Sequence, residues 1–305
     1  MESVRVAARH TLGPISESGS APVAGAGDLG RSDVASIAPA SVAPEQVDLE
    51  LVIPAYNEER RLGPTVLALA EELRGLPLSA ALRVIDNGSS DRTAECVDRL
   101  SATGTPVTVT GCSRRGKGAA VARGMVTTPA ARWVGFCDAD LATPAAAIED
   151  ALALLRDGWQ VVIGSRRCSG ARIPVRQPVL RRMGSAGFRL LTRRFSGSVR
   201  DTQCGFKFFQ AEAARQVFTG ITATGFAFDL EVIARARALG LTLAEFPVAW
   251  SDKRGSSFRV FADGRRVVGE LWRLHRELPN ALPRPAESPL AEPRAGEPRL
   301  AEGAG

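Results

Sequence analysis

Short apolar runs alternate with amphipathic stretches through the middle of the chain. The predicted strands are residues 49–53, 82–85, 107–109, 133–136 and 161–163. Apolar residues at helical spacing predict helices over 60–73, 93–100, 119–125 and 145–155. This alternation predicts an α/β fold with a mostly parallel central sheet covered on both faces. Ligands of such sheets bind at the carboxyl ends of the strands.

The two ends of the chain differ from this middle part. Residues 1–46 are rich in Ala, Gly, Ser and Pro without periodicity, and residues 279–305 are rich in Pro, Ala and Glu. Neither segment has enough apolar residues to offset the entropy lost on ordering. We therefore predict disordered tails on either side of one folded domain, residues 47–278.

Composition narrows the class of protein. The chain has 305 residues, a net charge of +6 and 45% hydrophobic residues, which is typical of a globular protein. No uncharged apolar run reaches the roughly 18 residues that cross a bilayer, and no secretory signal is evident. The five cysteines form no Cys-x-x-Cys pair. We expect a cytoplasmic protein with reduced thiols, without a signal peptide or transmembrane span.

Only two histidines are present, so chemistry is expected to depend on carboxylates, Arg, Lys and a bound ion. Two loops with polar side chains follow the first two predicted strands, at 54–59 and 86–91. In the second, Gly88 permits a tight turn, and Asp86 can accept hydrogen bonds from a ribose or a base. Each loop taken alone fits an ordinary turn equally well.

The third loop, residues 114–118, contains three cations and two glycines directly before a helix. Backbone N–H groups at a helix N-terminus, together with Lys and Arg, suit phosphate groups. The spacing is not that of a Walker A loop. A solvated basic turn is an equally good interpretation.

The fourth strand ends in Asp138 and Asp140, two carboxylates separated by one residue. Their mutual repulsion at the end of an apolar strand favours a compensating cation. Mg²⁺ or Mn²⁺, sharing its coordination with substrate phosphates, fits this pattern. A solvated turn is the alternative, which the apolar strand disfavours.

In combination these motifs are more specific than each is alone. Pro-Ala-Tyr-Asn-Glu, Asp-Asn-Gly-Ser-Ser-Asp, Gly-Lys-Gly and Asp-Ala-Asp occur on successive strands, and the chain resembles the family 2 glycosyltransferases. The resemblance implies a GT-A, Rossmann-like fold that binds a nucleotide sugar. Segments 163–166, 201–207 and 225–231 resemble the dolichyl-phosphate or polyprenyl-phosphate β-glucosyltransferase branch. The resemblance covers about residues 48–260.

On the donor side, the resemblance implies a uridine pocket lined by Pro54, Tyr56 and Glu58. It implies that Asp86 binds the base or ribose and that Lys117 lies near the uracil or the diphosphate. Asp138 would contact the nucleotide sugar at the metal site, and Asp140 would ligate the metal ion.

On the sugar and acceptor side, the resemblance implies a second group of residues. Asp229 is the carboxylate expected to act if a general base is needed. The residues implied on the sugar and acceptor side are Arg166, Gln203, Phe226, Phe228, Asp229 and Glu231.

The implied reaction is an inverting, one-step transfer from a UDP-sugar, expected to be UDP-glucose, to a polyprenyl phosphate of the dolichyl or undecaprenyl type. A lipid monophosphate, with a second pKa of about 6, is largely ionised at neutral pH and can attack without losing a proton. The demanding step is departure of the diphosphate, whose charge the metal ion and nearby cations must stabilise.

Residues 158–200 contain ten arginines and no acidic residue, so this stretch carries +10 in a chain of net +6. Apolar spacing predicts basic amphipathic helices at 178–195 and 260–277. Such helices can lie on a membrane surface, so peripheral association with the cytoplasmic face is expected. A packed helix with a solvated basic face is the alternative for the first. The second can also pack on the first or form a dimer contact.

Three other functions compete with this interpretation. Many relatives carry a membrane anchor and this sequence has none, so a soluble family 2 enzyme that glycosylates a small molecule remains open. A nucleotidyltransferase is disfavoured because the first strand is not followed by a Gly-rich nucleotide loop. Nucleic-acid binding is not expected, because aromatic residues make up only 6% and stacking platforms are scarce.

Overall fold

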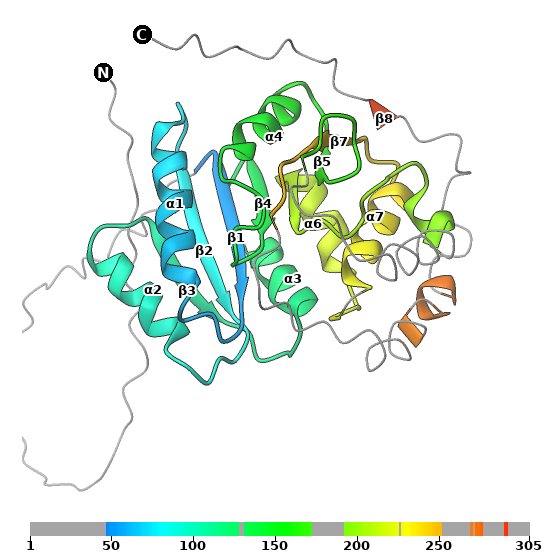
Figure 1. Ribbon diagram of the computed structural model, residues 1–305. Helices are drawn as coiled ribbons and strands as arrows, with labels where there is room; N and C mark the ends of the chain where they lie inside the picture. The colour runs from blue at the N-terminus through cyan, green and yellow to red at the C-terminus, as the bar shows by residue number, and fades with distance from the viewer. Residues whose placement is uncertain are drawn as a thin grey trace, which may run out of the picture.

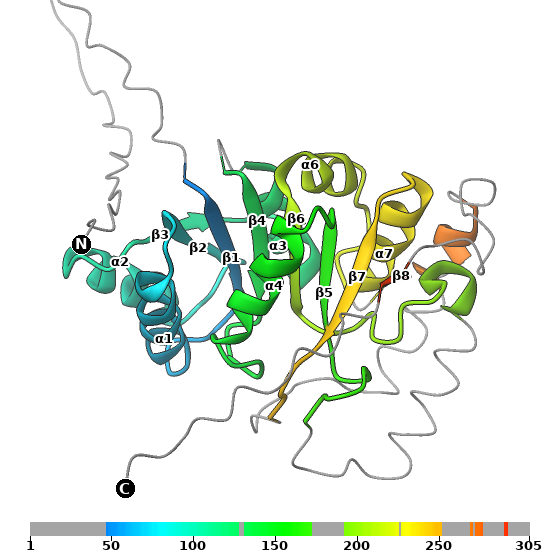
Figure 2. The ribbon, with the colours of Figure 1, turned by 90° about the horizontal axis from the view of Figure 1, so that it is seen from above.

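The computed structural model describes residues 47–127, 131–172, 192–225, 227–251, 269–270, 272–276 and 290–291. These residues form one eight-stranded sheet with helices on both faces (Figure 1 and Figure 2). The predicted α/β fold with a mostly parallel sheet is confirmed.

The sheet has the strand order β3-β2-β1-β4-β6-β5-β7-β8. Strand β6 is antiparallel to its neighbours β4 and β5, whereas the other paired strands are parallel. The strand order reverses between β1 and β4, and such switch points are where α/β sheets bind ligands. The bounds are β1 Leu49–Ala55, β2 Ala80–Asp86, β3 Val107–Gly111, β4 Trp133–Cys137, β5 Val161–Ser165, β6 Phe206–Gln210, β7 Leu243–Pro247 and β8 Leu290–Ala291.

Six helices of nine or more residues connect these strands within the described residues. They are α1 Leu62–Gly75, α2 Thr93–Ala102, α3 Lys117–Thr127, α4 Ala147–Arg156, α6 Ala211–Thr219 and α7 Phe228–Ala238. Every strand and helix predicted between 49 and 163 is present, with ends within two residues of the prediction. The apolar periodicity of this half of the domain is therefore a faithful guide to its elements.

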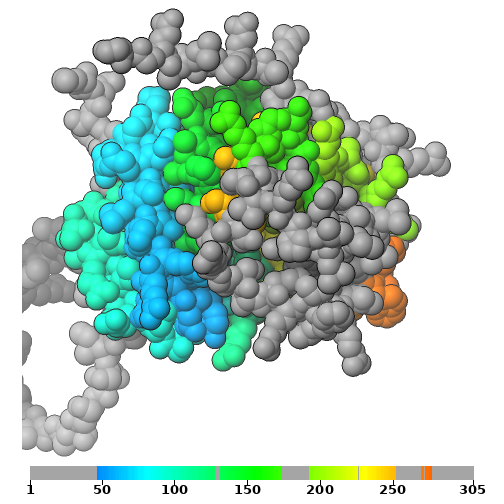
Figure 3. Space-filling model, viewed as in Figure 1, coloured from blue at the N-terminus to red at the C-terminus, as the bar shows by residue number. Residues whose placement is uncertain are grey.

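Successive residues of a strand point to opposite faces of the sheet, and they therefore belong to two separate hydrophobic cores. Leu51 and Ile53 of β1 face one cluster with α1, α2 and α4, while Val52 faces the other cluster with α3, α6 and α7. In the second cluster the rings of Phe136, Phe209, Phe218 and Phe228 contact one another. Each face of the sheet is thus closed by its own layer of helices. Figure 3 shows the first layer, with α1 in blue and cyan directly against the green β4 and α4 segment.

Strand β6 and helix α7 were not predicted as elements, because neither presents an amphipathic pattern. Four of the five β6 residues are buried, and Lys207 interrupts their apolar run. Helix α7 is buried nearly all round, including the charged side chains of Asp229, Glu231 and Arg237. A helix without a solvent face carries no 3.6-residue signal.

Several predictions fall on residues outside the described part of the chain. The helix predicted over 178–195 is described only from 192, and residues 192–196 are helical. Of the helix predicted over 260–277, residues 269–270 and 272–276 are described and helical. Leu290 and Ala291, within the predicted C-terminal tail, pair with β7. Among the helices of the described residues, none has the length and apolar content that a bilayer crossing requires.

Candidate active site

The loops that follow β1 and β2 are joined by reciprocal hydrogen bonds. The Asn57 N–H donates to Ser89 Oγ at 2.9 Å, and the Ser90 N–H donates to Asn57 Oδ1 at 2.8 Å. Asn57 has a φ of 55°, a conformation that Asn tolerates better than most residues. Thr93 Oγ1 accepts from the Glu58 N–H at 2.8 Å. The two loops therefore form one rigid edge of the site.

Asn87 connects this edge to the basic loop before α3. Its Oδ1 accepts from the Gly116 N–H at 2.7 Å, and its Nδ2 donates to the Arg114 carbonyl at 2.7 Å. Both functional ends of one amide are used, which fixes the position of the loop relative to β2. Sequence reasoning assigned Asn87 to a turn and missed this role, although its place in the Asp86–Asp91 loop was a signal.

The predicted uridine residues lie along the same edge. Tyr56 is 56% exposed, so its ring is accessible to a ligand. Glu58 accepts two hydrogen bonds from Arg61 at 2.7 Å each, and Asp86 accepts from the Ser89 N–H at 3.3 Å. Pro54 is partly buried near the end of β1. The structure brings these residues together, and their contact with uridine remains a prediction.

A row of alternating charges crosses the centre of the site. Lys117 Nζ, at the start of α3, lies 2.6 Å from Asp138 Oδ1 and 4.0 Å from Asp229 Oδ2. Lys207 Nζ, from β6, lies 2.5 Å from Asp229 Oδ1 and donates to the Cys204 carbonyl at 2.6 Å. Four segments far apart in the sequence are therefore joined by one chain of ion pairs, which we call the charge row: Asp138, Lys117, Asp229 and Lys207.

The members of the charge row differ in exposure. The side chains of Lys117 and Asp138 are 37% and 40% exposed, whereas Lys207 is completely buried and Asp229 is nearly so. Burial opposes the charged form of Lys117, but the carboxylates of Asp138 and Asp229 outweigh it and raise its pKa above the ordinary value. Lys117 is thus held as a cation at the accessible end of the row.

Asp140 is partly exposed, and its Oδ1 accepts from the Ala142 N–H at 3.1 Å. The described residues contain no cluster of three or more His, Cys, Asp or Glu that could hold a metal ion. Two carboxylates at a strand end, with the remaining ligands supplied by water and a diphosphate, fit the way Mg²⁺ and Mn²⁺ bind with phosphate substrates. The donor chemistry of Asp138 and Asp140 therefore fits the predicted ion.

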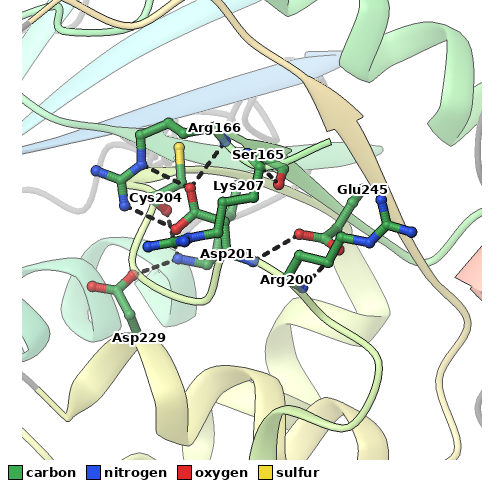
Figure 4. A network of polar contacts seen from close by, with 9 residues as sticks. Ser165, Arg166, Arg200, Asp201, Cys204, Lys207, Asp229 and Glu245 are labelled. Carbon is green, nitrogen blue, oxygen red and sulfur yellow. Dashed lines mark hydrogen bonds and ion pairs between the residues drawn. The ribbon is translucent and has the colours of Figure 1, made fainter. Parts of the chain in front are cut away.

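Segment 201–207 is fixed from two sides, as Figure 4 shows. The Arg166 guanidinium makes two hydrogen bonds to the buried Asp201 carboxylate, at 2.7 and 2.8 Å. Glu245 of β7 accepts from the Arg200 and Asp201 N–H groups at 2.8 and 3.0 Å. Arg166, predicted on the sugar side, is thus engaged with Asp201 through two of its nitrogens. The role of Glu245 has no signal in the sequence.

Two further residues of this segment are Gln203 and Gly205. Gln203 Nε2 is buried and finds no hydrogen-bond acceptor among the residues that the structure describes, an arrangement that a ligand oxygen would complete. A Cβ on Gly205 would lie 2.1 Å from Asp138 Oδ2. Glycine at 205 therefore permits the backbone to pass directly over the Asp138 carboxylate, a constraint that sequence reasoning did not identify.

Segment 221–231 supports the basic loop from the other side. The fully buried Glu231 carboxylate accepts from the Thr222 and Ala223 N–H groups, at 3.0 and 2.6 Å, and from Arg235 at 2.9 Å. The Thr224 carbonyl then accepts from the Gly118 N–H at 3.0 Å.

Two residues predicted to bind substrate are therefore structural in their contacts. Glu231 is saturated by partners of its own chain, and Phe228 is fully buried among the phenylalanines of the core. Both belong to α7, whose complete burial the sequence pattern did not reveal. Phe226, predicted with them, lies outside the described residues.

Two cysteines lie beside the charge row. Burial, with the nearby Asp201 carboxylate, raises the pKa of Cys204 to about 12. Burial, with the carboxylates of Asp138 and Asp140, also raises the pKa of Cys137 above its ordinary value. Both thiols are neutral at physiological pH, so neither supplies a thiolate to the site.

Comparison with known proteins identifies the family to which this geometry belongs. The family model described as Glycosyl transferase family 2 matches residues 50–218. The chain belongs to this family. It is therefore a glycosyltransferase, as the motifs predicted.

The sequence similarity between this glycosyltransferase and individual relatives covers more residues than the family match does. The dolichyl-phosphate beta-glucosyltransferase of Drosophila melanogaster is 33% identical over 231 residues, which are 70% of each chain. The human protein of that name is 29% identical over 229 residues, again 70% of each chain. Glycosyltransferase AglD of Haloferax volcanii is 31% identical over 244 residues, 77% of this chain and 39% of AglD. The chain thus spans well under half the length of AglD.

Solved structures of glucosyl-3-phosphoglycerate synthase from Mycobacterium tuberculosis share the fold. The complex of that protein with Mn²⁺ and UDP-glucose aligns with a TM-score of 0.57 at 19% identity, covering 78% of this chain and 80% of that one. The complex of the same protein with Mn²⁺, UDP and glucosyl-3-phosphoglycerate aligns with a TM-score of 0.56 at 18% identity. This alignment covers 78% of this chain and 81% of that one. The GT-A fold predicted for this glycosyltransferase is confirmed.

Replacement of Gly205 tests the close approach to Asp138. In Gly205→Ala the new Cβ would displace the Asp138 carboxylate, so we expect UDP-glucose to bind about tenfold more weakly or worse. Calorimetric titration with UDP-glucose and Mn²⁺ measures this affinity. Gly75→Ala is the matched control, because a Cβ at the end of α1 meets nothing within 4 Å. Equal affinities of Gly205→Ala and the control would contradict the constraint.

The Arg166 and Asp201 pair predicts a specific response to acid. Burial opposes ionisation of Asp201, but hydrogen bonding and charge from Arg166 outweigh it and hold the pKa of Asp201 below its ordinary 3.8. The ionised carboxylate therefore stabilises the fold above that value, and this contribution is lost as pH falls through the lower folded pKa.

We expect Asp201→Asn to lower the free energy of unfolding by about 3 kcal/mol at pH 7. The difference from the wild type should stay constant down to about pH 5 and shrink below about pH 4. Urea denaturation of both proteins from pH 7 to pH 3 measures it. A difference that is unchanged or larger at pH 3 would show that the Arg166 pairing is not its source.

Proposed function

We propose that this glycosyltransferase transfers glucose from UDP-glucose to a polyprenyl phosphate, with inversion at the anomeric carbon. An oxygen of the acceptor phosphate forms the new bond to C1 of glucose. The bond between C1 and the β-phosphate oxygen breaks on the opposite face, and UDP departs with the electron pair. No proton has to be removed from a phosphate monoester that is already ionised.

The observation that carries this proposal is the pairing of Asp229 with Lys207. Asp229 is the carboxylate predicted as a general base, and both of its oxygens face ammonium groups, at 2.5 and 4.0 Å. A proton accepted by Asp229 would leave the completely buried Lys207 without its counter-charge, which is costly in a buried site. This arrangement favours an acceptor that arrives as an anion over a neutral hydroxyl.

Four other described carboxylates in or near the charge row lead to the same preference. Asp138 is paired with Lys117, Asp201 with Arg166, and Glu231 with two N–H groups and Arg235. Asp140 is assigned to the metal ion together with Asp138. Protonation of any of these four carboxylates would disturb an ion pair, a hydrogen bond or the proposed metal site.

Departure of UDP requires positive charge close to the diphosphate. When bound, Mg²⁺ or Mn²⁺ would be held by Asp138 and Asp140 and would neutralise the charge that develops on the leaving group. Lys117 carries a fixed positive charge beside Asp138 and would donate to a diphosphate oxygen. The unpartnered Nε2 of Gln203 supplies a further donor for a sugar hydroxyl or phosphate oxygen.

The names of the relatives support a lipid phosphate as the acceptor. Several matches across about 70% of each chain are dolichyl-phosphate beta-glucosyltransferases. Residues 158–200 contain ten arginines and no acidic residue, and those other than Arg166, which is paired with Asp201, would supply positive charge to a lipid phosphate at a membrane surface. We propose peripheral binding to such a surface, through the basic helices predicted over 178–195 and 260–277.

Release of UDP tests the acceptor. The purified chain is given UDP-glucose and Mn²⁺ with liposomes that either contain or lack polyprenyl phosphate. We expect UDP release, and transfer of labelled glucose into the lipid phase, only with polyprenyl phosphate, and loss of both in Asp140→Ala.

Two results would overturn parts of the proposal. Release that depends on Mn²⁺ and ignores the lipid would replace the lipid acceptor with water or a soluble molecule. Wild-type turnover by Asp140→Ala would contradict the proposed metal ligand.

A further inference from the structure

Lys207 stands out because it places an ammonium group in the interior of the sheet. It belongs to β6, has 0% exposure and lies with Nζ 5.4 Å from the centre of the Phe136 ring. Its polar partners are the Cys204 carbonyl at 2.6 Å and Asp229 at 2.5 Å. Buried ion pairs are weak sources of stability, since apolar residues of similar size often stabilise a fold equally well. The charge of Lys207 therefore calls for a reason other than stability.

The position of Asp229 supplies this reason. It lies in the first turn of α7 and directs Oδ1 to Lys207 and Oδ2 towards Lys117. Figure 4 shows Asp229 reaching from α7 to the Lys207 ammonium beneath the 201–207 segment. Lys207 thus determines which way the Asp229 carboxylate points and keeps its second oxygen available to Lys117.

Lys117 needs such a second partner. Its ammonium sits on a flexible four-carbon stem and is 37% exposed, so one ion pair with the equally exposed Asp138 would leave it free to swing. A second carboxylate at 4.0 Å, on a rigid buried helix, limits this movement. The ammonium is then held between β4 and α7, beside the carboxylates assigned to the metal ion.

We propose that Lys207 is a positioning residue, which orients the Asp229 carboxylate and through it holds the Lys117 ammonium where it contacts the donor diphosphate. This inference rests on the proposed function in one respect, that the donor is a nucleoside diphosphate sugar. It is independent of the acceptor, and it gives Asp229 a role on the donor side of the reaction.

The first test removes the buried pair as a unit, in Lys207→Met/Asp229→Asn. Neither side chain then leaves an unpaired buried charge, so the unfolding temperature should stay close to that of the wild type. UDP, in the presence of Mn²⁺, is titrated by calorimetry, and no catalysis is involved. We expect UDP to bind about tenfold more weakly, and kcat to fall by more than the change in KM for UDP-glucose. A folded double variant with wild-type UDP affinity and kcat overturns the proposal.

A single variant, with folding checked by its unfolding temperature, provides a second comparison. In Asp229→Asn the amide oxygen still accepts from Lys207, whereas the charge that faces Lys117 is gone. The expected loss of UDP affinity is again about tenfold. Unchanged UDP affinity in folded Asp229→Asn contradicts the proposal.

A cycle with Lys117→Met separates positioning from other roles. If Lys207 and Asp229 act through Lys117, their replacement in a Lys117→Met background should weaken UDP binding by less than about twofold further. Effects that multiply instead would show that Lys207 and Asp229 influence UDP binding independently of Lys117, and would overturn the proposal.

A matched control is the ion pair of Glu50, near the amino end of β1, and Arg83, in the middle of β2. These side chains are 4% and 20% exposed, and neither belongs to the charge row or to the loops that form the site. Glu50→Gln/Arg83→Met should leave UDP affinity and kcat unchanged. A tenfold loss there would show that UDP affinity reports general loosening of the fold, and would overturn the proposal. Failure of the wild type to bind UDP contradicts the proposed function as well, whereas equal binding by wild type and double variant contradicts this inference alone.

Discussion

The charge row of Asp138, Lys117, Asp229 and Lys207 is the interaction on which the organisation of the site depends. It joins β4, α3, α7 and β6, whose residues are far apart in the sequence. Negative and positive side chains alternate along the row, so each charge is compensated by its neighbours. Removal of one member leaves a neighbouring charge uncompensated. The row begins at the half-exposed end of β4 and finishes inside the sheet, which connects the binding edge to the rigid core.

The backbone around the row is packed so closely that the sequence has little freedom there. Added Cβ atoms at Gly116 and Gly118 would lie 2.3 and 2.6 Å from carbonyl oxygens of segment 221–225, and one at Gly205 would meet Asp138. These approaches place the basic loop against segment 221–225, and the 201–207 segment against the Asp138 carboxylate. Glycine at these positions therefore serves the geometry of the charge row, and Gly116 also has a φ of 116°.

Much of the first half of the fold could be predicted from sequence, because its strands and helices are amphipathic or uniformly apolar in the expected way. Strand β6 and helix α7 could not, since Lys207, Asp229 and Glu231 are buried and mask the apolar pattern. The motifs predicted that Asp138 and Lys117 lie near the donor. Their ion pair could not be predicted, because it depends on a tertiary contact between the end of β4 and the start of α3. The engagement of Arg166 with Asp201, and the support from Glu245, follow from tertiary contacts that spacing does not encode.

With the buried Asp229 carboxylate already paired with Lys207, this family 2 glycosyltransferase is proposed to act on an acceptor that arrives ionised. A direct measurement compares a polyprenyl phosphate with the polyprenol of the same chain length, in the same liposomes with UDP-glucose and Mn²⁺. The account predicts glucosylation of the phosphate, and a rate for the alcohol at least about a hundredfold lower, because general-base help is worth about two to four orders of magnitude. Comparable rates for the two acceptors would show that a carboxylate of this site removes a proton, and would contradict the account.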